Sequence, residues 1–318
     1  MNRNAIEVQG LSKRYGKLLA VNGVSFAVAA GTAFGLLGLN GAGKTTTLKI
    51  LTGLIRPDQG SATVAGYDVV REPMAVRRNI GYVSENPGFY SRMSAVEILD
   101  YLGRLLEIPN RQRAPRIDYY LNLVGLEHKK HAQVGGFSRG MRHRLSLAQA
   151  MLGEPAVLFL DEPTLGLDPA GAKGMRDLIN RLKTEREVTI LMSSHVLPEV
   201  EAICGEVGIF DRGRLIARDS VENLRHTASD SMNLEVVLAE PDERVGQRLS
   251  ELPWVNSVQS EGNRILVNVI RNQEVRPRLL EHIFAVNKQI LSFQIKENSL
   301  EDILLRLVKQ PEDESYSW

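Results

Sequence analysis

The stretch "GLNGAGKTT", residues 38 to 46, decides the fold of this chain. It fits the pattern G-x-x-x-x-G-K-[ST] in full, follows an apolar run and opens a segment with helical spacing. Glycines let successive backbone amides converge on phosphate oxygens, and the start of a helix adds its dipole. The stretch therefore predicts a phosphate-binding loop. A glycine-rich turn between a strand and a helix that binds nothing is the alternative.

In such a loop the lysine and the hydroxyl that follows it have separate tasks. Lys44 is predicted to reach the β- and γ-phosphates of a nucleotide, and the Thr45 hydroxyl is predicted to hold Mg²⁺. The predicted nucleotide-binding residues of this stretch are Gly38, Leu39, Asn40, Gly41, Ala42, Gly43, Lys44, Thr45 and Thr46.

An acidic pair follows a second apolar run, "AVLFLDEP" (156–163). The run predicts a buried strand that ends at Asp161, which places a carboxylate at the strand tip where a P-loop sheet holds Mg²⁺. Glu162 is predicted to polarise the attacking water as a general base. Alone, an Asp-Glu pair after a strand is usually a solvated strand end, so this prediction depends on the P-loop upstream.

The next apolar run, "VTILMSSH" (188–195), ends at His195. The segment between the two runs, residues 170–186, has the spacing of an amphipathic helix, and the order strand, helix, strand implies a parallel sheet. His195 would then share a sheet edge with Asp161, where an imidazole can bond the γ-phosphate and the attacking water. A single histidine at a strand end is more often incidental. The predicted fold class is α/β.

Composition limits what the chain can be. With 318 residues, 43% hydrophobic and 24% charged, it is long for one domain and comfortable for two. A net charge of +1 excludes a global basic field for nucleic acid. Cys204 is the only cysteine, which excludes an internal disulfide and a multi-cysteine metal site. The N-terminus lacks the apolar core of a signal peptide.

A long uncharged segment lies between Lys17 and Lys44. It is long enough to cross a bilayer. Polar residues and glycines interrupt it where strand turns would fall, so we expect buried strands there and no membrane span.

The stretch "VGGFSRGMRHR" (134–144) precedes another apolar helical pattern. Its glycines, its serine and the basic side chains Arg139, Arg142, His143 and Arg144 predict an anion site at a helix start. A nucleic-acid backbone and a nucleotide phosphate both fit this composition.

The chain from about residue 5 to 220 resembles the ATP-binding subunit of an ABC transporter, because these motifs occur in the order typical of that family. The matching motifs are Walker A "GLNGAGKT", Walker B "VLFLDEP", the D-loop "GLD" (166–168) and the switch histidine His195. The resemblance implies a P-loop NTPase cassette with a mixed sheet core and a helical subdomain at about 88–150. It also implies that Tyr15 stacks on adenine and that Asp168 faces the other protomer's site. An exposed strand aromatic is the alternative for Tyr15.

Two motifs depart from the family pattern. Residues 137–141 stand in place of the signature LSGGQ: Ser138 and Gly140 agree with it, whereas Phe137, Arg139 and Met141 depart. Arg139 adds a cation, and Ser138, Arg139 and Gly140 are expected at a partner's ATP. Glu85 stands where the family usually carries glutamine and is expected near Mg²⁺. In one interpretation the charge of Glu85 strengthens Mg²⁺ binding and repels the carboxylate of Glu162. In the other, glutamate in place of glutamine keeps an oxygen ligand and changes little.

The resemblance also implies partners. One P-loop and one signature per chain require a second cassette, most simply a second copy with ATP at the interface, and a separate membrane permease. The loop with Glu85, "FSRGM", "GLDP" and a terminal domain ending in "SLEDILLRL" resemble cassettes of ABC-2 type exporters. This resemblance implies that the chain is cytoplasmic and peripheral on the cytoplasmic face of the cell membrane. An importer subunit, a soluble ABC ATPase acting on nucleic acid or the ribosome, and a non-enzymatic scaffold are the alternatives. Soluble ABC ATPases of that class carry paired cassettes, zinc-binding cysteines or a long coiled coil. This chain has one cassette, one cysteine and no heptad run between Lys44 and Ser138, so no nucleic-acid partner is predicted.

The domain prediction places the cassette at 1–222 and a polar linker at 223–233. Residues 234–310 read as strand, helix, hairpin, helix, strand and a last helix at 299–309, a small α+β domain of split-βαβ type for dimerisation, regulation or stability. Residues 311–318 read as a frayed tail. Within the cassette, Ser94 with Glu97 three residues later predicts a helix start, and residues 117–126 predict a second helix.

Overall fold

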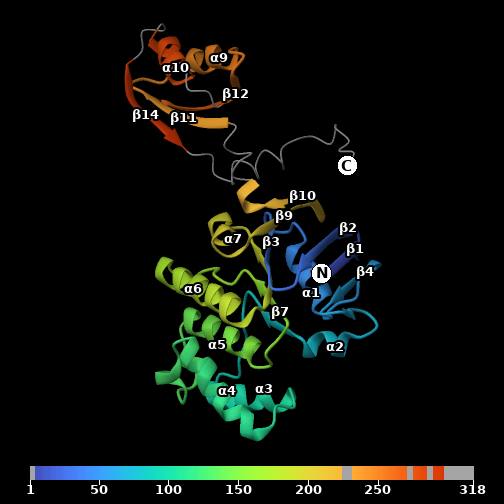
Figure 1. Cartoon of the computed structure of the whole chain (residues 1–318). Helices are drawn as coiled ribbons and strands as arrows, with labels where there is room; N and C mark the ends of the chain where they lie inside the picture. Colours follow the sequence, from blue (N-terminus) through green and yellow to red (C-terminus); the bar gives the residue numbers. More distant parts are fainter. Residues whose placement is uncertain (1–3, 224–230, 271–274, 285–288, 297–318) are drawn as a thin grey trace. The chain divides into compact units, whose positions relative to one another are not determined.

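The computed structural model describes residues 4–223, 231–270, 275–284 and 289–296 (Figure 1). Contacts divide the chain into two compact units, Met1–Ser220 and Val221–Trp318.

The first unit is built on a six-stranded sheet in the order β10-β9-β3-β8-β7-β6. Five neighbouring strands run parallel, and β10 is antiparallel to β9 at one edge. The strands are β3 (Ala33–Leu37), β6 (Ile80–Val83), β7 (Val157–Asp161), β8 (Thr189–Ser194), β9 (Glu206–Asp211) and β10 (Arg214–Ser220). Every residue of β3, β7 and β8 is buried, as a parallel sheet covered on both faces requires.

A second, antiparallel sheet lies on the far side of helix α1 (Lys44–Leu51). Its order is β2-β1-β4-β5, with β1 (Asn4–Tyr15), β2 (Leu18–Ala29), β4 (Gln59–Val64) and β5 (Tyr67–Asp68). Because α1 contacts β2 and β4 as well as β7 and β8, it lies in the apolar core between the two sheets. The mixed sheet core predicted for the cassette is confirmed.

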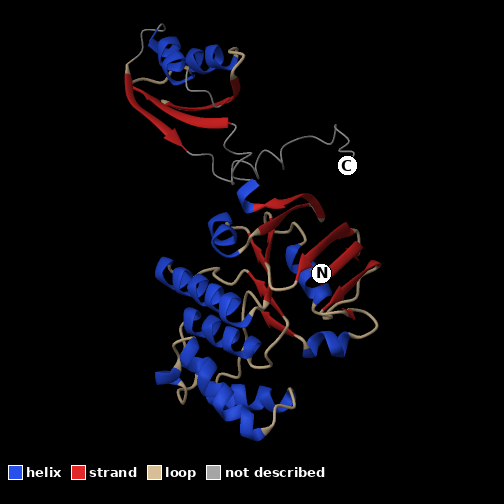
Figure 2. Ribbon diagram, viewed as in Figure 1, coloured by secondary structure: helices blue, strands red, loops and turns tan. Residues whose placement is uncertain are grey.

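Helices form most of the rest of the first unit. They are α2 (Pro73–Arg78), α3 (Ala95–Leu105), α4 (Asn110–Leu123), α5 (Arg139–Met151), α6 (Pro169–Arg186) and α7 (Leu197–Ile203), with short 3₁₀ turns η1 (Glu127–Lys129) and η2 (Val134–Gly136). Helices α3, α4, α5 and α6 lie on the side away from β1, β2 and β4, whereas α2 contacts β5 and β6 (Figure 1, Figure 2). Helices α3, α4 and α5 pack on one another. The predicted start of α3 is confirmed: Ser94 Oγ accepts from the Glu97 amide at 3.3 Å, and Glu97 Oε2 accepts from the Ser94 amide at 2.7 Å.

The uncharged segment after Lys17 folds as β2 and β3, as predicted. In the part of the chain that the structure describes, no helix has both the length and the apolarity that a bilayer crossing needs.

The second unit is a four-stranded antiparallel sheet in the order β12-β13-β11-β14. Its elements are β11 (Ser231–Leu238), α9 (Glu243–Ser250), β12 (Val255–Glu261), β13 (Arg264–Ile270), α10 (Val275–Phe284) and β14 (Ile290–Lys296). The inward side chains of β11 and β13 form its core with those of α9 and α10. This order of strands and helices is the predicted split-βαβ arrangement. The predicted last helix at 299–309 and the tail at 311–318 lie outside the described residues.

Strand β11 begins at Ser231, inside the segment 223–233 that was predicted to be a linker; residues 224–230 lie outside the described residues. The sequence suggested a linker because this stretch is polar. In the structure Asn233 is 4% exposed, and its Oδ1 accepts from Asn268 Nδ2 at 2.6 Å on the neighbouring strand. A polar residue therefore fits inside the strand because its amide is paired across the sheet.

Candidate functional site

The loop that the sequence predicts to bind phosphate joins β3 to α1, the strand and the helix expected on either side of it. Gly41 and Gly43 have φ of +83° and +104°, in the left-handed region that favours glycine. A Cβ at Gly43 would collide with the carbonyl oxygen of Ala20, and one at Gly38 with that of Phe210. The loop is therefore held close to two neighbouring backbones, and the first turn of α1 leaves its amides without intrahelical partners. This cradle suits a phosphate group.

Lys44 lies over this loop and is 5% exposed. Its Nζ donates to the carbonyl oxygens of Gly38 at 2.7 Å and Leu39 at 3.1 Å, and it lies 3.7 Å from Glu162 Oε1. Burial lowers the pKa of Lys44, and the nearby carboxylates of Glu162 and Asp161 oppose that shift. The ammonium group is thus held by groups that a bound phosphate can replace.

Asp161 ends β7 and faces α1. Its Oδ1 accepts from Thr45 Oγ1 at 2.9 Å and from Ser193 Oγ at 2.6 Å, while Oδ2 accepts from the Tyr82 hydroxyl at 3.3 Å. Burial, followed by the charge of Asp161, raises the pKa of Tyr82. The predicted pair of metal-binding oxygens, from Thr45 and Asp161, is therefore brought together.

Ser193 and Tyr82 were not predicted as site residues. Ser193 also accepts from the Glu162 amide at 3.3 Å, so one hydroxyl bonds to both acidic residues. No motif marks either residue in the sequence. The signal that could have found them is their position at the ends of β8 and β6, the two strands beside β7.

Glu162 is 6% exposed and has φ of +49°, and its Oε1 lies 3.7 Å from Lys44 Nζ. Its Oε2 lies 2.8 Å from His195 Nδ1. Burial raises the pKa of Glu162, and the neighbouring His195 and Lys44 oppose that shift. A carboxylate with a raised pKa and a bonded imidazole has the composition of a general base.

Glu85 lies on the loop after β6, half-buried, and its Oε1 accepts from Asn86 Nδ2 at 3.3 Å. Its charge contributes to the raised pKa of Tyr82, which bonds to Asp161. Tyr15 ends β1 with 48% of its surface exposed, and the Lys13 ammonium lies 5.8 Å from its ring centroid. An exposed ring is free to stack on a base.

The predicted signature residues form the start of α5. Ser138 is the N-cap, and its Oγ accepts from the Met141 amide at 3.2 Å. Ser138 and Arg139 are exposed and Gly140 is half-buried, so this end of the helix is open to a ligand. Asp168 is exposed at the N-cap of α6.

His143 does not belong to the basic cluster in which the sequence placed it. It is 1% exposed, and its Nδ1 lies 3.1 Å from the carbonyl oxygen of Pro163. Helical periodicity turns it inward from its basic neighbours, and burial lowers its pKa, which favours the uncharged imidazole.

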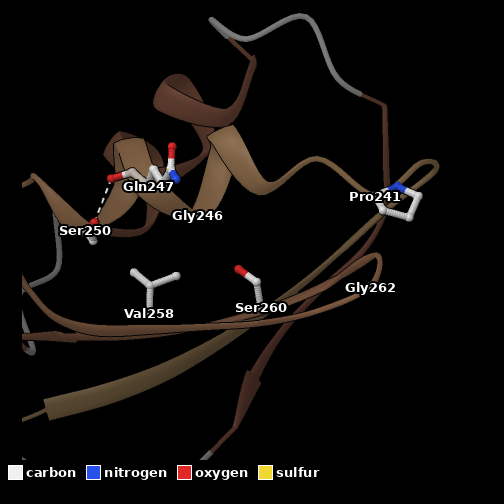
Figure 3. Close-up of a pocket in the computed structure, with 7 residues that line it drawn as sticks. All are labelled: Pro241, Gly246, Gln247, Ser250, Val258, Ser260 and Gly262. Atoms are coloured by element: carbon white, nitrogen blue, oxygen red, sulfur yellow. Dashed lines mark hydrogen bonds between the residues drawn. The ribbon is translucent and has the colours of Figure 1, made fainter.

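A pocket of about 410 Å³ lies in the second unit, between α9 and the strands (Figure 3). Gln247 and Ser250 line it from the helix, and Ser260 points toward them from β12. None of its seven lining residues is charged, so it lacks the cation that a triphosphate needs. The lining residues are Pro241, Gly246, Gln247, Ser250, Val258, Ser260 and Gly262.

Known proteins resemble this chain along most of its length. A family model described as "ABC transporter" matches residues 21–165. The bacitracin transport ATP-binding protein BcrA of Bacillus licheniformis is 35% identical over 304 residues, which cover 95% of this chain and 97% of that protein. The daunorubicin resistance ATP-binding protein DrrA3 of Streptomyces coeruleorubidus is 37% identical over 84% of this chain and 83% of its own.

A solved structure of the ATP-binding subunit of an ABC transporter superposes on this chain with a TM-score of 0.64. It is 31% identical and covers 70% of this chain and 92% of its own length. The resemblance seen in the motifs is thereby confirmed, and this chain belongs to the family of ATP-binding subunits of ABC transporters.

Proposed function

We propose that the ATPase activity of this chain powers a separate membrane permease in an exporter of ABC-2 type. The observation that carries this proposal is the meeting of Lys44, Thr45, Asp161, Glu162 and His195, which come from three separate stretches of sequence, at one edge of the central sheet. The names of the relatives, a bacitracin transport protein and a daunorubicin resistance protein, support export as the direction.

In this proposal Glu162 accepts the proton of the water that attacks the γ-phosphate. His195 Nδ1 bonds to Glu162 Oε2, so the imidazole fixes the carboxylate and can itself contact the γ-phosphate. Lys44 binds the β- and γ-phosphates after leaving the carbonyl oxygens of Gly38 and Leu39. The loop residues from Gly38 to Thr46 surround the phosphates, and Tyr15 stacks on the adenine.

The residues present also fit Mg²⁺, although the described residues contain no group of three or more His, Cys, Asp or Glu that could hold a metal. Mg²⁺ commonly takes one or two protein oxygens together with substrate phosphates, which matches Thr45 Oγ1 and the Asp161 carboxylate. The charge of Glu85 acts on Tyr82, whose hydroxyl donates to Asp161. When bound, Mg²⁺ would neutralise charge that develops on the phosphates.

The second partner in this proposal is another copy of the chain. Ser138, Arg139 and Gly140 lie at a helix start that presents amides and a cation, and within its own chain the Arg139 guanidinium lies against the Gly166 backbone. An ATP bound at the P-loop of a second copy would supply an anion for this helix start, and Asp168 would face that copy's site. ATP then joins the two copies, and hydrolysis separates them.

The permease would dock beside the Glu85 loop in this proposal. Tyr90 and Tyr101 are 66% and 44% exposed there, with ring centroids 6.3 Å apart. Large exposed aromatic side chains are typical of interface cores. Docking to a permease would make this chain peripheral on the cytoplasmic face of the cell membrane. The second unit would support dimerisation or regulation.

Co-expression with a candidate membrane subunit, chosen from any membrane protein encoded beside this chain, tests the proposal. We expect the two proteins to purify together in detergent, with two copies of each, and we expect the double variant Tyr90→Ala, Tyr101→Ala to lose the complex and keep ATPase activity. Tyr67→Ala, on β5 and 36% exposed, is the matched control. Recovery of the native chain with ribosomes or nucleic acid instead would contradict the transporter assignment.

A further inference from the structure

His143 is a buried titratable residue that the proposed mechanism does not use. It is the fifth residue of α5 and lies 3.1 Å from the carbonyl oxygen of Pro163 through its Nδ1. A carbonyl oxygen only accepts, so Nδ1 carries the proton and Nε2 keeps its lone pair. The hydrogen bond links the signature helix to the residue directly after Glu162.

The chain from Glu162 to Asp168 forms a continuous pair of turns. The Leu165 amide donates to the Glu162 carbonyl oxygen at 3.1 Å, and the Leu167 amide donates to that of Thr164 at 3.1 Å. Asp168 then occupies the N-cap position of α6. Because these turns start at Glu162, a shift of the turns would move the backbone that carries its carboxylate.

The first turn of α5 meets the same turns at two further points. A Cβ at Gly166 would collide with the guanidinium of Arg139, so that group lies against the Gly166 backbone. A Cβ at Gly140 would lie 3.9 Å from Leu167 Cδ2. The helix start and the segment 162–168 therefore share a contact surface, which includes the His143–Pro163 hydrogen bond.

Packing alone does not require an imidazole at this place. Among the residues that the structure describes, His143 Nε2 is buried and has no hydrogen-bond partner. Burying a polar atom without a partner is unfavourable, and a leucine would fill similar space without that cost. What His143 supplies and leucine lacks is the donor at Nδ1.

We propose that His143 is a positioning residue whose Nδ1–H ties the Pro163 turn to α5, so that Ser138 and Glu162 of one chain move together. The inference rests on the proposed role of Glu162 as the general base. It predicts that contact of Ser138 with the partner's ATP is transmitted to the catalytic carboxylate of its own chain, which couples the two sites of the dimer.

Three substitutions separate the donor from the packing. The amide nitrogen of asparagine can take the place of Nδ1, that of glutamine lies nearer the place of Nε2, and leucine offers no donor. For His143→Leu and His143→Gln we expect kcat of ATP hydrolysis to fall about 3- to 10-fold with KM unchanged, the effect of losing one neutral hydrogen bond. His143→Asn should stay within about twofold of the native kcat, since it restores that bond.

Amide hydrogen exchange gives a readout that does not depend on turnover. In the nucleotide-free protein, the Leu165 and Leu167 amides should exchange about 3- to 10-fold faster in His143→Leu and at the native rate in His143→Asn. If leucine and asparagine variants behave alike in kcat and in exchange, the donor has no role and the proposal is wrong. If Glu162→Gln instead retains activity, the general-base assignment fails while the exchange result still decides whether His143 holds the turn.

Discussion

Replacement of Glu162 by glutamine removes one proton acceptor and leaves the shape of the site in place. Glutamine retains an oxygen that can accept from His195 Nδ1, which lies 2.8 Å from Oε2 in the native chain. Lys44 retains its bonds to the Gly38 and Leu39 carbonyl oxygens. We therefore expect the variant to fold and to bind ATP.

Two effects of this change oppose each other in the energy of the folded state. At 3.7 Å the Coulomb attraction between Lys44 and Glu162 is about 4–5 kcal/mol at an effective dielectric constant of about 20. The variant loses that attraction, but it also loses the cost of burying a carboxylate that is 6% exposed. Because these terms largely cancel, the free energy of unfolding of the variant should change much less than the activation free energy of its ATP hydrolysis.

The rate of ATP hydrolysis should fall strongly in Glu162→Gln. Loss of a positioned general base typically lowers kcat by about 10²- to 10⁴-fold, or about 3–5 kcal/mol of activation free energy. Phosphate release at saturating ATP with Mg²⁺ measures this loss. Size-exclusion chromatography of the same variant with ATP should show a dimer, because the ATP that joins the two copies is not cleaved. Glu154→Gln, in a surface ion pair with Arg116 at 3.1 Å, is the matched control and should keep its rate.

A fall in kcat of less than about tenfold with ATP binding intact would show that another group takes the proton. A monomer in the presence of ATP, with or without Mg²⁺, would contradict the shared-ATP dimer even if the rate falls as expected.

Two other substitutions test the remaining site assignments. Ser138→Ala should lower ATPase activity by at least about tenfold and leave ATP binding by the monomer nearly intact. Ser138→Thr keeps the helix cap and should lose less ATPase activity. A large loss of ATP binding by the Ser138→Ala monomer would show that the signature contacts the ATP of its own chain and not that of the partner. Glu85→Gln should raise the Mg²⁺ concentration for half-maximal activity roughly two- to fivefold if the charge of Glu85 acts at the metal. Unchanged turnover with unchanged Mg²⁺ dependence would discard that electrostatic idea.

The sequence predicts the residues that meet in this site because strand ends do most of the positioning. Asp161 and His195 each follow an apolar run, and the carboxyl ends of parallel strands share one edge of the sheet. Lys44 follows the loop after β3, which pairs with β8 in the same sheet. Once the apolar runs are assigned as parallel strands, the sequence alone predicts that these side chains lie close together.

Contacts between elements are what the sequence does not reveal. Helix α4 begins at Asn110, seven residues before the predicted start at Ile117, although Pro115 lies inside it and cannot donate its backbone hydrogen bond. Arg113 stabilises this first part: it is 9% exposed and bonds to Asp100 at 2.6 Å and to the Ile108 carbonyl oxygen at 3.0 Å. Tertiary contacts of one side chain thus outweigh local preference.

The burial of His143 is a similar case. In the sequence it is one of four basic residues, and charge composition alone groups it with Arg142 and Arg144. The structure separates them because α5 packs one face on its neighbours, and position 143 lies on that face. Hydrophobic periodicity of the helix could have indicated this, since His143 is spaced three and four residues from Gly140 and Leu147.

The charges of the site explain why the same residues serve both binding and reaction. Lys44 and Glu162 are both buried, and burial lowers the pKa of the first and raises that of the second, so each shift favours the neutral form. A triphosphate at the P-loop would add negative charge near both. That charge would favour the ammonium form of Lys44, which binds it, and would raise the basicity of Glu162, which must take a proton in its presence. Substrate binding would thus strengthen both the cation that holds the phosphates and the base that acts on the water beside them.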